Sequence, residues 1–222
     1  MIASAPALPY PWFLPLANRL EARMAAEEAI RDGAHDLSHS LRVARLAHEL
    51  VAEEGADGDV AVAAALLHDL IWVPKNHADS PRTAALAAEL APELCRDLPG
   101  LAAKVGAIAA AILTHSFSGG GLAATLEAQI VQDADRLEAI GAIGIARVFA
   151  TGGSFGAGLW HALDPWASAR PLDDKAWSLD HFPKKLLRLA EGMNTSAGQR
   201  RAVARQQLLE AFLLALREEL GP

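Results

Sequence analysis

The 222 residues of the chain are enough for one globular domain, and a hydrophobic share of 52% excludes a largely disordered protein. The net charge of −7 argues against a dedicated nucleic-acid-binding or membrane-surface protein. Because Cys95 is the only cysteine, no internal disulfide can form, as in most proteins of a reducing compartment. We expect a soluble cytoplasmic protein without a signal peptide or membrane helix. We expect it to be a monomer or a homodimer.

Alanine-rich windows with a repeat near 3.6 residues predict an all-α, single-domain fold. Prolines near helix starts and glycines just past helix ends suggest where most of the helices begin and stop. We expect helices from Pro15 to Gly33, over 37–54 with Gly55 as the stop, from Asp57 or Asp59 to His68, and over 81–91, 100–114, 125–150, 182–192 and 197–219.

The last predicted helix carries an apolar stripe along one side. Most stripes of this kind face a core, so we expect a core-facing surface, with a dimer interface as the alternative. The stripe consists of Val203, Leu209, Phe212, Leu213, Leu216 and Leu220.

Histidines and aspartates interrupt several of the apolar helix faces. His39 shares a face with Val43, Leu46 and Leu50, whereas His48 lies nine residues further on and should be exposed to solvent. His68 lies on a face of small residues at the end of its helix, and His115 ends the apolar run VGAIAAAILTH. Asp133 and Asp135 interrupt the apolar segment that follows.

Several imidazoles and carboxylates at apolar positions need a common partner, and a divalent cation is the simplest one. A mixed nitrogen and oxygen set suits Mn²⁺ first, with Mg²⁺, Co²⁺, Ni²⁺ or Fe²⁺ as alternatives. The single cysteine excludes a Cys-rich structural zinc site.

Five motifs in order resemble the HD-domain metal-dependent phosphohydrolases, and in particular a YedJ-like subgroup. They are HDLSHSLRV, HDLIWVPKNH, THSFS, QDADRLEAIGAIGIARVFA and DP…RPLDDK…LDHFPKKLL, and they cover the chain from about residue 25 onward. The resemblance implies an HD-type helical fold with a metal site between core helices. It also implies the metal ligands His39, His68, Asp69 and Asp135, and the hydrolysis of phosphoester or phosphoanhydride bonds, commonly in nucleotides.

Composition and the resemblance together divide the chain. Residues 1–24 would be an N-terminal extension and the start of the first helix, and 25–150 the HD-domain core with the metal site. Residues 151–181, rich in glycine, proline and tryptophan, would form a lid-like irregular segment, as long loops in compact domains often do. Residues 182–222 would be C-terminal helices packed on the same domain.

At two places the sequence does not follow the family pattern directly. Helical periodicity places Asp133 nearer than Asp135 to the face of Leu137 and Ile140, whereas the resemblance selects Asp135 and leaves Asp133 to orient a ligand imidazole. Some relatives also carry an acidic residue three positions after the HD aspartate for acid–base chemistry. Trp72 stands there in this chain, so the general base must be another group.

Around the metal ligands we assign catalytic roles to Asp69, His115 and Lys75. His115 could bind phosphate, transfer a proton or complete a second metal site, and its alternative is a structural histidine at a helix end. Lys75 and Asn76 follow the HD motif closely enough to bind phosphate. Arg42, Arg136 and Lys184 are further substrate-binding candidates, each with a surface ion pair as the alternative. We interpret His35 and Asp36 as the capping turn of the second helix.

These observations predict a metal-dependent phosphohydrolase that uses a metal-activated water to cleave a small phosphorylated substrate. The substrate class that we favour is a nucleotide. A non-catalytic nucleotide sensor with the same fold is the alternative, and a di-iron oxygenase ranks last.

Overall fold

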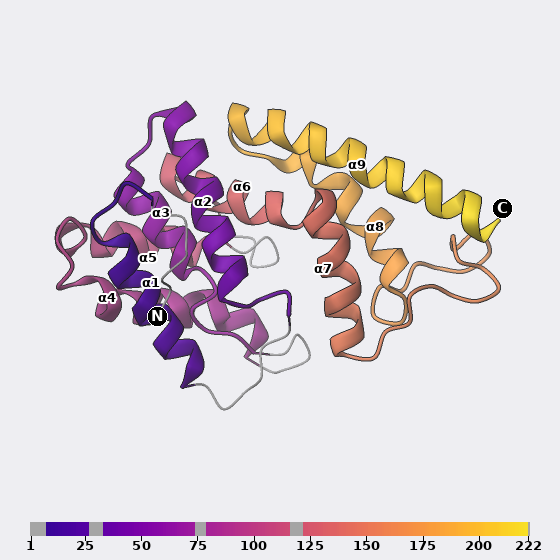
Figure 1. Cartoon of the computed structure of the whole chain (residues 1–222), viewed down its shortest axis with the longest axis horizontal. Coiled ribbons are helices and arrows are strands. Elements are labelled where there is room, and N and C mark those ends of the chain that lie inside the picture. The colour runs from indigo at the N-terminus through magenta and orange to yellow at the C-terminus, as the bar shows by residue number, and fades with distance from the viewer. Residues whose placement is uncertain (1–7, 27–32, 74–78, 116–121, 222) are drawn as a thin grey trace. The chain divides into compact units, whose positions relative to one another are not determined.

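A computed structural model of the chain describes residues 8–26, 33–73, 79–115 and 122–221. Within these ranges the secondary structure is helical without any strand, which confirms the all-α prediction (Figure 1). The helices are α1 (Phe13–Ala25), α2 (Leu37–Glu54), α3 (Gly58–Leu67), α4 (Thr83–Cys95), α5 (Val105–Leu113), α6 (Leu126–Glu138), α7 (Gly141–Ser154), α8 (His181–Lys184) and α9 (Ser196–Leu220), with short 3₁₀ turns between them. None of these helices is both long enough and apolar enough to cross a membrane.

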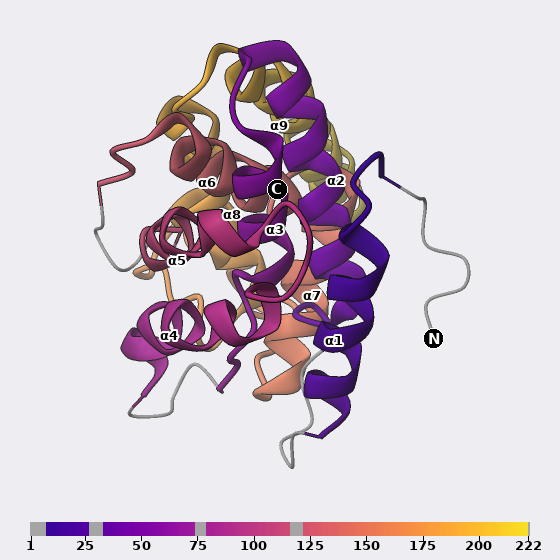
Figure 2. The same ribbon diagram turned by 90° about the vertical axis from the view of Figure 1, so that its left-hand side faces the viewer.

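The chain divides into two compact units. The N-terminal unit consists of residues 1–31 and 35–135, and the C-terminal unit of residues 32–34 and 136–222. In the N-terminal unit α3 is the central helix, because it packs against α1, α2 and α5 (Figure 2). Every residue from Val60 to Leu67 is buried, so α3 has no solvent-facing side.

Local capping explains where the two central helices begin. The Asp36 side chain accepts a hydrogen bond from the backbone N–H of His39 and starts α2. Asp57 does the same for the backbone N–H groups of Asp59 and Val60 at the start of α3. α2 ends at Gly55, whose φ of 77° is the left-handed conformation that glycine adopts most easily, so the predicted span of 37–54 is confirmed.

The C-terminal unit is built around α9. Phe182 of α8 stacks on Phe212 of α9 at a ring-centroid separation of 5.7 Å, and α7 packs along the same helix. The predicted apolar stripe of α9 is only partly core-facing: Leu209 and Leu216 are buried, whereas Val203 is 50% exposed. Residues 155–177 contain no helix. An ion pair between Arg170 and the buried Asp180 and an isolated bridge between Gly158 and Trp177 fix their path.

The prediction of one continuous helix over 125–150 was wrong, because the chain breaks between α6 and α7. Ile140 is extended and Gly141 has a φ of 75°, a conformation that costs a residue with a Cβ about 1–2 kcal/mol. A Cβ on Gly141 would also lie 3.1 Å from Cγ of Arg205. A glycine inside an apolar helical pattern gives no sign that the helix stops there.

Replacing Gly141 with alanine should therefore lower the free energy of unfolding by about 1–2 kcal/mol, measured by urea denaturation. Gly153 is the matched control, since it lies in the same helix α7 with nothing within 4 Å of an added Cβ. Gly153→Ala should be neutral or stabilising by up to about 1 kcal/mol. Equal losses in both variants would contradict a specific role for the break at Gly141.

Candidate metal centre

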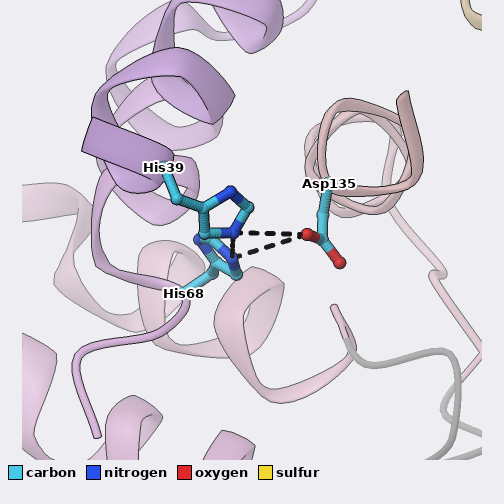
Figure 3. Close-up of side chains that lie close together, drawn as sticks. All are labelled: His39, His68 and Asp135. Carbon is cyan, nitrogen blue, oxygen red and sulfur yellow. Dashed lines mark hydrogen bonds and ion pairs between the residues drawn. The ribbon is translucent and has the colours of Figure 1, made fainter. Parts of the chain in front are cut away.

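Three side chains from three segments of the N-terminal unit meet at one point. His39 comes from the first turn of α2, His68 directly follows α3, and Asp135 comes from α6 (Figure 3). Their ligand atoms all lie within 4.8 Å of one another, and both imidazoles are buried. Asp69 follows His68 in the turn that ends α3 and contacts the same pair of imidazoles.

The distances fit a single cation. Nε2 of His39 lies 3.2 Å from Nε2 of His68. The Asp69 Oδ2 atom lies 3.5 Å from the first of these nitrogens and 3.2 Å from the second. The Asp135 Oδ1 atom lies 3.6 Å and 3.7 Å from them, respectively. Since metal–ligand bonds of about 2.0–2.2 Å place neighbouring octahedral ligands about 3 Å apart, the four side chains have nearly the spacing that a divalent cation requires.

Backbone carbonyls fix the tautomers of two imidazoles. Nδ1 of His68 lies 2.8 Å from the carbonyl oxygen of Ala65, and Nδ1 of His115 lies 2.7 Å from that of Ile112. A carbonyl oxygen only accepts, so each Nδ1 carries the proton and donates it. In the neutral tautomer, Nε2 of each ring is then left with its lone pair, which is the form that binds a metal or accepts a proton.

The charges of His68 and Asp69 are strongly coupled. Burial lowers the pKa of His68, but the adjacent Asp69 carboxylate, its hydrogen bond and the charge of Asp135 outweigh burial and raise the pKa to about 9. Burial raises the pKa of Asp69, but His68 and the hydrogen bonds from His39 and His68 hold this pKa well below its usual value. In the metal-free protein a proton on His68 therefore balances part of the carboxylate charge.

His115 lies beside this cluster. Its ring centroid is 5.1 Å from that of His68, and its Nε2 atom is 3.8 Å from Oδ1 of Asp69. Burial lowers the pKa of His115, the charge of His68 lowers it further, and Asp69 opposes both effects. The side chain of Gln132 donates to the carbonyl oxygen of Thr114 at 2.6 Å and holds the backbone just before His115.

The two aspartates of α6 have separate places. Asp133 is fully buried, as its helical position relative to Leu137 indicated, whereas the Asp135 side chain is 31% exposed and faces the two imidazoles. The carboxylate near the imidazoles is therefore the one that the family resemblance selects.

Three of the predicted substrate-binding residues contact groups outside the cluster. Arg42 donates to the hydroxyl of Ser38 one turn earlier in α2. Arg136 donates to the carbonyl oxygen of Gly192, and Lys184 pairs with Asp174 at 2.5 Å, both within the C-terminal unit. Lys75 and Asn76 lie outside the described residues.

Sequence reasoning missed one neighbour of the cluster. The ring centroid of His35 is 6.0 Å from that of His39, and its charge contributes to the low pKa of Asp69. His35 lies in the turn just before α2, so its place in the HDLSH motif was the available signal. His48, which we expected to be exposed, is half-buried, and its Nδ1 atom lies 3.1 Å from the hydroxyl of Tyr10.

The chain matches one family model and is similar to several known proteins. The family model of the HD domain matches residues 36–140, which include all four predicted ligands. The uncharacterized protein YpgQ of Bacillus subtilis is 35% identical in an alignment of 192 residues that covers 84% of each chain.

Solved structures are also similar over nearly the whole chain. The crystal structure of Bacillus subtilis YpgQ in complex with ADP matches with a TM-score of 0.67 at 30% identity, and covers 91% of this chain and 97% of that one. An HD-superfamily hydrolase from Bacillus thuringiensis matches with a TM-score of 0.63 at 29% identity, and covers 92% of this chain and 94% of that one.

Proposed function

The chain belongs to the HD-domain family, and from this premise we propose that it is a metal-dependent phosphohydrolase that cleaves a phosphoester or phosphoanhydride bond in a nucleotide. The observation that carries the proposal is the cluster of His39, His68 and Asp135 with Asp69 beside it. A YedJ-like subgroup remains our more specific prediction.

We assign the metal ligands to His39, His68, Asp69 and Asp135. Two carboxylates offset the charge of a divalent cation, and two imidazoles add the nitrogen ligands that suit Mn²⁺ ahead of Mg²⁺, Co²⁺, Ni²⁺ or Fe²⁺. A cation bound there would polarise a phosphoryl oxygen and lower the pKa of a water molecule. The exposed side of Asp135 is where a substrate can approach, because its side chain is 31% exposed while both imidazoles are buried.

Asp69 and His115 are the residues that we assign to proton transfer. With its Nδ1 proton held by the carbonyl of Ile112, a neutral His115 turns an accepting Nε2 atom toward Asp69, 3.8 Å from Oδ1. An attacking water between these side chains could give its proton to either group. This arrangement offers a base where Trp72 replaces the acidic residue of some relatives.

A nucleotide is the favoured substrate class because a relative with 30% identity over 91% of the chain, Bacillus subtilis YpgQ, was crystallised with ADP. Lys75 and Asn76 follow Asp69 by six and seven residues, and we propose that they and Arg42 bind phosphate. Arg136 and Lys184 belong to the C-terminal unit and are second candidates for this role.

Phosphate release from nucleoside mono-, di- and triphosphates tests the proposal. Protein treated with chelator should be inactive and should regain activity with Mn²⁺, and Asp69→Ala should lower kcat/KM at least about a hundredfold. Asp97→Ala is the matched control, since Asp97 forms an exposed ion pair with Arg19 in the same unit. The released product, phosphate or pyrophosphate, identifies the bond that is cut.

A nucleotide sensor without catalysis is the second candidate, and the replacement of the acidic residue by Trp72 favours it. It predicts nucleotide binding in the presence of Mn²⁺ without turnover. If the metal binds stoichiometrically but no nucleotide is hydrolysed, the sensor would replace the hydrolase as the proposed function.

A further inference from the structure

A glutamine side chain of α6 is buried in the N-terminal unit. Gln132 is only 4% exposed, and its neighbours Val131 and Ala134 are fully buried. Burying an amide costs free energy unless the amide forms hydrogen bonds, so packing alone would favour an apolar side chain of the same size at this position. The glutamine therefore indicates a polar partner that leucine or methionine could not bind.

That partner is the backbone just after α5. The Gln132 amide donates to the carbonyl oxygen of Thr114 at 2.6 Å, and the last carbonyls of a helix have no partner inside the helix. The next residue is His115, whose Nδ1 atom donates to the carbonyl oxygen of Ile112 at 2.7 Å. One hydrogen bond therefore fixes the His115 ring against its own backbone, and a second one, from α6, holds the peptide group that carries the ring.

The same helix carries a proposed metal ligand. Asp135 follows Gln132 by three residues, so the two positions lie about 60° apart around α6. α6 therefore presents a carboxylate to the two buried imidazoles and an amide to the backbone before His115. We propose that Gln132 is a positioning residue that holds His115 beside Asp69 for proton transfer. This inference rests on the proposed function, because it takes His115 as a proton-transfer group.

Gln129 provides the matched control, one turn earlier in the same helix. Its amide also donates to a backbone carbonyl oxygen, that of Ala123, at 3.2 Å. This bond fixes the segment that leads into α6 and does not involve the peptide before His115. If hydrogen bonds from α6 to the backbone only stabilised the fold, Gln129 and Gln132 would affect His115 alike.

The first test observes His115 in the metal-free protein, in a nitrogen–proton correlation spectrum of the histidine rings. His115→Ala identifies its resonances by their loss. Gln132→Met keeps the length of the side chain but has no donor, and it should shift the His115 resonances. Gln132→Asn keeps the amide but is one methylene too short to reach Thr114, and it should shift them as well. Gln129→Met should leave them in place.

Urea denaturation shows that each variant compared is folded. The proposal would be overturned if the His115 resonances kept their positions in the folded Gln132 variants. It would also be overturned if Gln129→Met shifted them equally. Neither result depends on catalytic activity.

The second test measures turnover of the nucleotide that the wild-type chain hydrolyses. Gln132→Met should lower kcat at least about tenfold, because a small displacement of a proton-transfer group slows the reaction strongly. The Kd for Mn²⁺ should stay within about twofold of the wild-type value, since the four proposed ligands are unchanged. In a His115→Ala background, Gln132→Met should cause no further loss, because a positioning residue acts only through the group that it positions.

Equal losses of kcat in both backgrounds would show that Gln132 acts independently of His115, and they would overturn the proposal. A wild-type chain that hydrolyses no nucleotide would instead overturn the proposed function, and the catalytic role of Gln132 with it. The two failures are therefore distinguishable, because the first requires an active wild-type chain.

Discussion

Asp135→Asn should lower the affinity for Mn²⁺ at least about a hundredfold while the helical content stays unchanged. The carboxylate oxygen lies 3.6 Å from Nε2 of His39 and 3.7 Å from Nε2 of His68, so it completes the group of ligands. The amide keeps the size of the side chain but loses the negative charge that binds a divalent cation. Isothermal titration of chelator-treated protein with Mn²⁺ gives the affinity and the stoichiometry directly.

Asp133→Asn is the matched control, two residues away in the same helix. Asp133 is fully buried, so its substitution should change the free energy of unfolding more than the metal stoichiometry. A loss of metal binding in Asp133→Asn with normal binding in Asp135→Asn would exchange the roles of the two carboxylates and contradict the proposed ligand set.

The affinity for Mn²⁺ should rise about tenfold per pH unit up to about pH 9 and then level off. In the metal-free protein burial lowers the pKa of His68, but the Asp69 carboxylate outweighs burial and raises it to about 9, so the imidazole is protonated at neutral pH. A metal binds only the neutral imidazole, and each bound cation must displace that proton. Titrations over a pH series, in two buffers with different ionisation enthalpies, measure both the slope and the proton released.

The raised pKa of His68 should also make the metal-free protein less stable as the pH rises. A group whose pKa is raised on folding from 6.5 to about 9 stabilises the fold fully below pH 6.5, and this contribution is lost as the pH rises toward 9. Thermal unfolding in chelator should therefore show Tm falling over this window. A metal affinity that does not change below pH 9 would show that His68 is neutral before the metal binds.

Much of the N-terminal unit follows from local signals in the sequence. Asp36 and Gly55 mark the two ends of α2, and the apolar face that contains Val43 places His39 in the interior. The burial of His68 follows in the same way from the alanines around it. These predictions succeed because a cap and a period of 3.6 residues depend only on neighbours in the chain.

The remaining features depend on contacts between distant residues. Periodicity correctly places Asp133 in the interior, but the cluster lies where α6 is partly exposed, so the buried aspartate is not the one that faces the imidazoles. Gly141 begins α7 after the break that follows α6, and Arg205 occupies the space that a side chain there would need. His48 is half-buried because Tyr10, thirty-eight residues earlier, reaches it.

A helix without a solvent side also links metal binding to folding. Because α3 is enclosed by α1, α2 and α5, it cannot turn or shift without disturbing three neighbours, and His68 and Asp69 leave directly from its end. A cation bound by these ligands would hold the end of α3 against α2 and α6. With the metal bound, the helix ends around it should therefore be the last parts of the N-terminal unit to unfold on heating. Removal of the metal should change where unfolding begins.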